Sequence, residues 1–290
     1  MTTLLMYLAV TFCTVTSAHA ADPPHHLDGP DAPPVTLANT ETRQLRATSN
    51  GQLYQLKIKF PRGYETETAH YPVLYVTDAE TNFGAVSYIV QRLTKDHLIP
   101  KVLVVGIAYD TDYRNFYRLR SRDLTPTEDP DLRIGGRAVA DPTGGANAFC
   151  DFIEDQLVPF IDRKYRTKKG DRALYGHSYG GLFGCHVLLS RPDLFQRYLL
   201  LSPSLWFDDR VMFDRIESAI RPTAPLVVYL ASGELEGRID DLQVRFVELL
   251  NNHPHPQIEL TSEVLENETH RTIFGRGITN GLRRIYAEQP

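Results

Sequence analysis

The segment that most constrains the fold is Gly176-His177-Ser178-Tyr179-Gly180, which matches the pattern G-x-S-x-G. A short apolar run, Arg172 to Tyr175, precedes it, and a longer one, Tyr179 to Ser190, follows it. This context predicts a strand, a sharp turn and a helix, with the serine raised at the turn. Bulky residues at the glycine positions would clash between strand and helix. The alternative is an ordinary strand-to-helix turn with an incidental serine.

At such a turn the serine hydroxyl lies above the edge of the sheet, and the following helix directs its N-terminus at the same place. Backbone N–H groups there stabilise negative charge that develops on a substrate. We therefore predict that Ser178 is a nucleophile and that the N–H of Tyr179 is one of two oxyanion donors. The second donor is expected in Asp78-Ala79-Glu80, after an earlier strand, and we assign it to the N–H of Glu80.

The rest of the chain alternates between strand-like and helix-like patterns. The run Gln52 to Phe60 alternates with period two, as in a half-exposed strand. Pro72 to Thr77 and Val102 to Tyr109 are continuous apolar and β-branched runs, typical of strands buried on both faces. Further strands are predicted at residues 172–175, 198–201, 226–231 and 258–265, and helices at 146–165, 179–190, 241–250 and 277–288. Pro159 is expected to bend the first of these helices near its end.

This alternation predicts a mostly parallel central sheet with helices on both faces. Together with the nucleophile turn, it gives the α/β class and the α/β-hydrolase fold. Residues 110–145 lack strong periodicity and are predicted to form a long loop at the carboxyl edge of the sheet, where such folds bind ligands. Residues 21–45 are predicted to be an extended leader, and residues 46–290 a single domain.

The first residues have the pattern of an export signal. Leu4 to Val15 is almost entirely apolar, and Ser17-Ala18-His19-Ala20 ends in small residues that a signal peptidase reads. The apolar run is too short for a permanent membrane helix. We expect a signal peptide at 1–20, cleavage near Ala20, a periplasmic or secreted product and no stable membrane anchor. The alternative is a disordered or mis-started N-terminus.

Charge and cysteine content limit the kinds of partner and cofactor that the chain is expected to have. Lys and Arg number 31 against 36 for Asp and Glu, a net charge of −5, which gives no reason to expect nucleic acid. No Cys/His cluster has zinc spacing, and no Gly-rich phosphate loop is present, so no metal or other cofactor is expected. Cleavage of the signal would leave Cys150 and Cys185, either as a disulfide or as two buried thiols.

A serine nucleophile needs a base and a carboxylate that orients the base. In this fold they follow in the order serine, acid, histidine. Of the histidines after Ser178, His270 lies in the loop between the last strand and the final helix, so it is the predicted base. The predicted acid is Glu236, three residues after Gly233, with Glu234 as the alternate. One of the two glutamates could instead cap the next helix.

At this point the chain resembles the putative esterase family, which contains periplasmic esterases of enterobactin-type siderophores. More distant relatives include S-formylglutathione hydrolase, feruloyl esterases and mycolyltransferases. The resemblance covers roughly Tyr54 to Tyr286. The motifs that carry it are Tyr71-Pro72-Val73-Leu74-Tyr75, Arg120-Ser121-Arg122-Asp123-Leu124-Thr125-Pro126, Gly144-Gly145-Ala146, Gly176-His177-Ser178-Tyr179-Gly180-Gly181-Leu182-Phe183-Gly184, Ser202-Pro203-Ser204-Leu205-Trp206, Gly233-Glu234-Leu235-Glu236 and Glu268-Thr269-His270.

The resemblance implies ester hydrolysis on Ser178 and His270 without a metal cofactor. Trilactone-cleaving members can work with a Ser-His dyad, which leaves the role of Glu236 open. The family's usual Asp-Gly-Asp is replaced here by Asp78-Ala79-Glu80. A positive φ is costly at Ala79, so the oxyanion donor is the least secure part of the comparison.

The resemblance also suggests substrates. Ferric catecholate siderophores are anionic, and Arg120 and Arg122, with Arg118, could meet that charge. These arginines could equally form ordinary ion pairs with Asp112, Asp123 and Glu128. The sequence thus leaves three hypotheses: an exported serine carboxylic-ester hydrolase that cleaves siderophore trilactones through an acyl-enzyme, a general acyl or feruloyl esterase, and a non-catalytic binding protein of the same fold.

Overall fold

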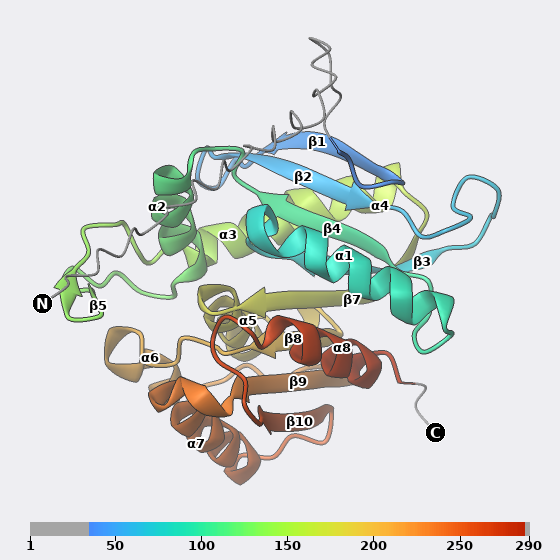
Figure 1. The fold of residues 1–290 in the computed structure, drawn as a ribbon. Helices are drawn as coiled ribbons and strands as arrows, with labels where there is room; N and C mark the ends of the chain where they lie inside the picture. The colour runs from blue at the N-terminus through green and yellow to red at the C-terminus, as the bar shows by residue number, and fades with distance from the viewer. Residues whose placement is uncertain (1–34, 288–290) are drawn as a thin grey trace, which may run out of the picture. The chain divides into compact units, whose positions relative to one another are not determined.

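Eight strands hydrogen-bond into one sheet in the order β1-β2-β4-β3-β7-β8-β9-β10 in the computed structural model, which describes residues 35–287 (Figure 1). β2 runs antiparallel to β1 and β4, and the other neighbouring pairs are parallel. The mostly parallel sheet and the α/β class are therefore confirmed. The strands are β1 Thr40–Arg46, β2 Leu53–Lys59, β3 Tyr71–Val76, β4 Leu103–Ala108, β7 Thr167–His177, β8 Arg197–Leu201, β9 Leu226–Gly233 and β10 Ile258–Leu265.

Helices cover both faces of this sheet (Figure 1). α1 (Ala79–Lys95) and α8 (Phe274–Ile285) lie on one face, and their apolar side chains pack on residues such as Tyr175 and Tyr229. The opposite face is covered by α3 (Ala146–Phe152), α4 (Val158–Lys164), α5 (Tyr179–Ser190) and α7 (Arg238–Asn252). Because the central strands are buried on both faces, they read as continuous apolar runs.

Three predicted boundaries were wrong. β1 begins at Thr40, inside the predicted leader, and pairs along its whole length with β2. The predicted loop 110–145 contains α2 (Tyr113–Leu124) and a small hairpin of β5 (Arg133–Ile134) and β6 (Arg137–Ala138). The predicted helix 146–165 is divided by a π-helical turn at Ile153–Leu157, just before Pro159. A proline lacks the N–H of a regular helix, so the break falls at this junction.

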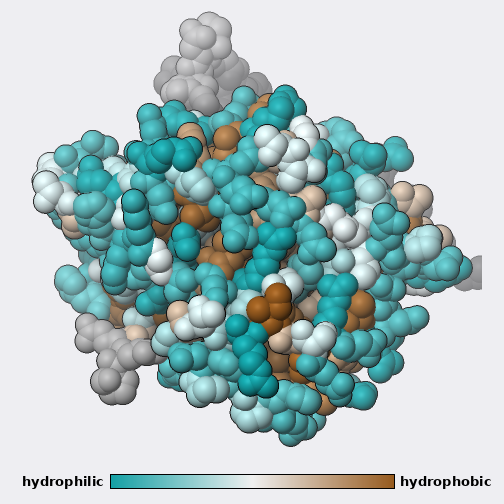
Figure 2. Space-filling view, turned by 180° about the vertical axis from the view of Figure 1, so that it is seen from behind, coloured by the Kyte–Doolittle hydropathy of each residue, from teal (hydrophilic) through white to brown (hydrophobic). Residues whose placement is uncertain are grey.

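The described residues from Leu37 onward form one compact unit. The predicted signal peptide and most of the predicted leader lie outside the described residues. No helix within residues 35–287 is long and apolar enough to cross a membrane. The face seen in Figure 2 is mostly hydrophilic, with only small hydrophobic patches.

The two cysteines of the described chain are free thiols. Cys150 in α3 and Cys185 in α5 are both buried. Burial raises the pKa of both, that of Cys150 to about 12, so both stay protonated and unreactive at neutral pH. Of the two alternatives, the structure therefore shows two buried thiols and no disulfide between Cys150 and Cys185.

Candidate active site

Ser178 lies at the sharp turn between β7 and α5. Its φ of 60° and ψ of −116° are unusual for a residue with a side chain. A Cβ at Gly176 would clash with the backbone carbonyl of Gly180, and one at Gly180 would clash with Thr77 Oγ1. Both glycines of the motif are therefore required by close packing, as the pattern predicted.

Glu236 and His270 meet at the same edge of the sheet. His270 Nδ1 lies 2.7 Å from Glu236 Oε2, and the Glu236 side chain is fully buried. The other carboxylate oxygen, Oε1, accepts hydrogen bonds of 2.6 Å from Ser202 Oγ and from the N–H of Gly233. A buried carboxylate with three donors is well suited to hold one orientation and one tautomer of an imidazole.

Glu234, the alternate acid, has a different environment. It is exposed, and its Oε2 accepts the N–H of Asn267 at 3.0 Å. The next residue, Leu235, donates its N–H to the carbonyl of Glu268 at 2.9 Å. Glu234 therefore holds the loop that carries His270 and does not contact the imidazole.

Ser178 and His270 both line a cavity of about 500 Å³. In this cavity Ser178 Oγ lies 3.3 Å from Ser204 Oγ, and the N–H of Ser204 donates to the Ser178 carbonyl at 3.2 Å. Five aromatic residues line it, Phe116, Tyr117, Tyr179, Trp206 and Phe274, together with charged residues that include Asp78, Asp141 and Arg271. A cavity of this volume, lined by both aromatic and polar residues, can hold a small molecule.

Two helix N-termini face this site. α5 begins at Tyr179 and α1 at Ala79, after Asp78, which has φ 52° and ψ 47°. The positive φ thus falls on Asp78, and Ala79 avoids the strain expected for it. N–H groups at the start of a helix have no partner within the helix, so these two N-termini are where the predicted oxyanion donors would lie.

The second predicted oxyanion residue, Glu80, is not among the residues that line the cavity. Its side chain turns away and accepts the N–H of Tyr109, and burial raises the pKa of its carboxyl group. These contacts concern the side chain, so the donor role of its N–H stays a prediction. The same holds for the N–H of Tyr179.

The two predicted substrate-binding arginines are already paired. Arg120 forms a two-bond ion pair with Asp78, with both distances 2.8 Å, and its guanidinium lies 5.0 Å from the centre of the Tyr179 ring. Arg122 Nε lies 2.7 Å from Asp123 Oδ1, and Arg122 does not line the cavity. Arg122 thus forms the ion pair with Asp123 that was the alternative to substrate binding. Arg120 does reach the cavity, but its charge is neutralised by Asp78.

Several site residues were not predicted from the sequence. Ser202 and Ser204 follow β8, which places them at the same carboxyl edge of the sheet as Ser178. Their position directly after a predicted strand could have identified them as site residues. Arg271, beside the predicted base, is exposed and lines the cavity. His177 also lines it, and its Nε2 donates to the carbonyl of His270 at 2.9 Å.

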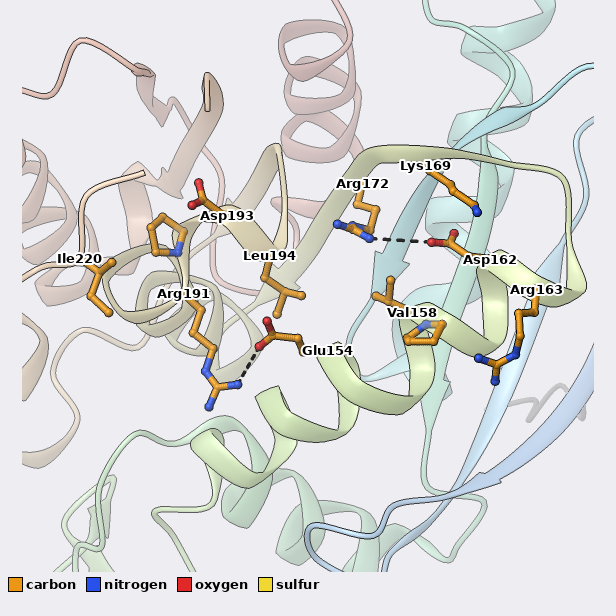
Figure 3. Close-up of a pocket in the computed structure, with 12 residues that line it drawn as sticks. Glu154, Val158, Asp162, Arg163, Lys169, Arg172, Arg191, Asp193, Leu194 and Ile220 are labelled. Carbon is orange, nitrogen blue, oxygen red and sulfur yellow. Dashed lines mark hydrogen bonds and ion pairs between the residues drawn. The ribbon is translucent and has the colours of Figure 1, made fainter. Parts of the chain in front are cut away.

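A second cavity, of about 660 Å³, lies elsewhere, between α4 and the start of β8 (Figure 3). Its charged residues are mostly paired with one another. Arg191 lies 2.9 Å from Glu154, and Arg172 lies 3.9 Å from Asp162. It has no candidate nucleophile, so we place the chemistry in the cavity of Ser178. Within residues 35–287, no group of three or more His, Cys, Asp or Glu side chains could hold a metal ion.

Comparisons with known proteins show the family of this chain. Residues 47–271 match the family described as Putative esterase. The ferri-bacillibactin esterase BesA of Bacillus subtilis is 36% identical over 212 residues, which are 69% of this chain and 72% of that protein. The siderophore triacetylfusarinine C esterase of Aspergillus fumigatus is 32% identical over 183 residues, 60% of this chain and 59% of that protein.

Solved structures share the fold. The IroE-like serine hydrolase of Shewanella oneidensis superposes with a TM-score of 0.74 and 28% identity. The match covers 85% of this chain and 80% of that one. A similar protein with this fold is thus named as a serine hydrolase.

Proposed function

This chain belongs to the putative esterase family and is a serine carboxylic-ester hydrolase, and from that premise we propose that it cleaves the ester bonds of siderophores. The observation that carries the hydrolytic part of the proposal is the buried Glu236 carboxylate bonded to His270 at the cavity of Ser178. This arrangement supports a Ser-His-Glu triad and argues against a dyad, because Glu236 has the burial and the contact that an orienting acid needs.

In the proposed mechanism the Ser178 hydroxyl turns from Ser204 toward His270. Ser178 Oγ attacks the ester carbonyl carbon while His270 takes its proton, and Glu236 stabilises the imidazolium that forms. N–H groups at the starts of α1 and α5 hold the oxyanion. Collapse breaks the ester C–O bond, and His270 protonates the leaving alcohol. Water, deprotonated by His270, then hydrolyses the acyl-enzyme and restores Ser178.

Anionic ferric siderophores are the proposed substrates, and exposed arginines at the cavity mouth support this. Arg271 lines the cavity directly. Arg137 is paired across the hairpin with Ile134, another lining residue, so both side chains lie on the same hairpin face. Arg118 follows the lining residue Tyr117 on α2 but does not itself line the cavity, and all three arginines are exposed. A ferric tris-catecholate is anionic because three dianionic groups surround one Fe³⁺.

The similar proteins support the same substrate class. The Bacillus subtilis relative is a ferri-bacillibactin esterase, and the Aspergillus fumigatus relative is a siderophore triacetylfusarinine C esterase. A more distant relative, from Xylanibacter ruminicola, is named as a xylanase and feruloyl esterase and is 26% identical over 61% of this chain. The aromatic cavity also fits a feruloyl ester, so this class belongs in the substrate test.

Ser178→Ala tests the nucleophile. Purified protein is expected to hydrolyse p-nitrophenyl butyrate, and the variant to lose at least about 10³-fold in kcat. Hydrolysis at the wild-type rate by the variant would contradict the assignment. A panel of a ferric trilactone siderophore, its iron-free form, a feruloyl ester and simple acyl esters then tests the substrate. The ferric trilactone is expected to have the highest kcat/KM, and a higher value for the feruloyl ester would overturn the siderophore proposal.

Export to the periplasm or the medium is part of the proposal. Its support is the apolar run Leu4 to Val15 followed by small residues up to Ala20. N-terminal sequencing of protein recovered from cell fractions tests it. A mature chain that begins near Ala21 outside the cytoplasm would support export, whereas a chain with Met1 intact in the cytoplasm would contradict it.

A further inference from the structure

We propose that His177 is a positioning residue that holds the base His270 in register with Ser178. The inference rests on the proposed function, because it assumes that Ser178 and His270 react together. His177 directly precedes Ser178 at the end of β7, and it contacts His270, which follows 93 residues later. One dipeptide therefore carries both the nucleophile and a support for its base.

Two contacts join His177 to His270. A carbonyl oxygen only accepts, so the 2.9 Å contact from His177 Nε2 to the His270 carbonyl is an N–H donation, and it requires the tautomer protonated at Nε2. The imidazole rings also lie against each other, with centroids 4.5 Å apart. Phe274 packs on His177 at the same centroid distance, 4.5 Å, so the ring of His177 is itself held in place.

These contacts complete the support of the base. Glu236 holds only Nδ1 of the imidazole, which leaves the ring free to tilt about that hydrogen bond. Glu234 and Leu235 hold the loop at Asn267 and Glu268, before the base is reached. His177 holds the backbone of His270 itself and one face of its ring. It thereby restricts the tilt that would move the other ring nitrogen away from Ser178.

The charge state of His177 suits this role. Its removal from water, with His270 and Arg120 nearby, lowers the pKa of His177 to about 3. It therefore stays neutral whenever His270 can act as a base, keeps the Nε2 proton for the carbonyl, and adds no positive charge against the imidazolium that forms on His270.

Three substitutions at His177 separate the hydrogen bond from the ring. His177→Gln keeps an amide donor at about the reach of Nε2, His177→Asn carries the same group too short to reach, and His177→Phe keeps only the ring. The matched control is His186→Phe in α5. His186 is also neutral, with a pKa lowered to about 4 by burial, and its Nε2 contacts Asn147 at 3.0 Å, away from the cavity.

The assay uses p-nitrophenyl butyrate, so that it does not depend on the siderophore substrate. We expect His177→Asn and His177→Phe to lose about 10- to 100-fold in kcat with little change in KM, as for a misplaced catalytic group. His177→Gln should keep kcat within about threefold of wild type. Because His177 is neutral throughout, the ratio of wild-type to variant kcat should be constant from about pH 5 to 9.

Thermal unfolding of each variant separates positioning from packing. A loss of kcat in His177→Asn that His177→Gln restores, at similar Tm, supports the proposal. Wild-type kcat in His177→Asn overturns it, as does an equal loss of kcat in Asn, Gln and the His186→Phe control. If His177→Phe does not fold, the Asn and Gln pair still decides. Wild-type protein inactive on every ester would instead contradict the proposed function itself.

Discussion

Glu236 and Glu234 lie two residues apart and yet have opposite surroundings. Glu236→Gln keeps the shape of the side chain but removes the charge that stabilises the imidazolium of His270. Its amide NH2 can also donate to Nδ1 of His270, which would favour the tautomer without a proton on Nδ1. We expect kcat for p-nitrophenyl butyrate to fall about 10³-fold. Glu234→Gln should change kcat less than about fivefold, because an amide oxygen can still accept the N–H of Asn267. Equal losses in both variants would contradict the assignment of the acid.

Glu80 allows a prediction about pH and stability. Burial, with Asp78 nearby, raises the pKa of Glu80 in the folded chain. The folded state then binds more protons than the unfolded state as the pH rises from 4.5 through the raised pKa, so the free energy of unfolding falls across that window. Glu80→Gln removes this loss and can still accept the N–H of Tyr109. In urea unfolding, the free energy of unfolding of the variant minus that of wild type should be more positive at pH 7 than at pH 4.

Local pattern and chain order were enough to choose candidate catalytic residues that the structure brings to one cavity, but not to find the partners of the arginines. Ser178 could be found because its turn leaves a local pattern, and His270 and Glu236 because each follows a recognisable strand. Arg120 could not be interpreted this way. Its partner Asp78 lies 42 residues earlier in the chain, and only the fold brings the two together. Arg122, by contrast, pairs with its own neighbour Asp123, one of the partners considered.

Helix α2 is attached to the active site through Arg120. This ion pair joins α2 to the turn at Asp78, which starts α1, and both side chains are largely buried. Arg120→Ala leaves the Asp78 carboxylate buried without its partner, so we expect a loss of about 3–5 kcal/mol in the free energy of unfolding. Arg118→Ala, on an exposed position of the same helix, should change it by less than about 0.5 kcal/mol. Urea unfolding monitored by circular dichroism measures both.

Elements with a strong local apolar signal were predicted well, and those stabilised mainly by tertiary contacts were not. β10 was predicted with its observed bounds, Ile258–Leu265, and α5 with Tyr179–Ser190. α2 was missed because only four of its residues are buried, Phe116, Ser121, Asp123 and Leu124, and two of them are polar. Its stability comes from packing on α3 and α5 and from the ion pairs, which a local pattern does not contain.

The chain as a whole is acidic, whereas the charged residues that line its cavity balance. The net charge is −5, but Arg120 and Arg271 line the cavity together with Asp78 and Asp141. Arg120 and Asp78 neutralise each other. We therefore expect an anionic substrate to be repelled less at the site than by the acidic surface elsewhere, and Arg137, on the hairpin face of the lining residue Ile134, to add attraction there. Such a distribution favours productive encounters over nonspecific ones.

This distribution predicts a salt dependence that differs between substrates. For a ferric tris-catecholate trilactone, kcat/KM should fall severalfold as ionic strength rises from about 0.01 to 0.15 M, because the Debye length shrinks from about 30 to 8 Å. For neutral p-nitrophenyl butyrate it should stay nearly constant. Arg137→Glu should weaken the dependence for the anionic ester.

Arg133→Glu is the matched control for that variant. Arg133 lies in the same hairpin and pairs opposite Ala138, so its side chain lies on the face opposite that of Ile134 and Arg137. The two substitutions change the net charge equally, and therefore only the position of the charge differs. If both variants altered the salt dependence to the same degree, the effect would come from net charge alone. A larger change in Arg137→Glu would place the attraction at the cavity mouth.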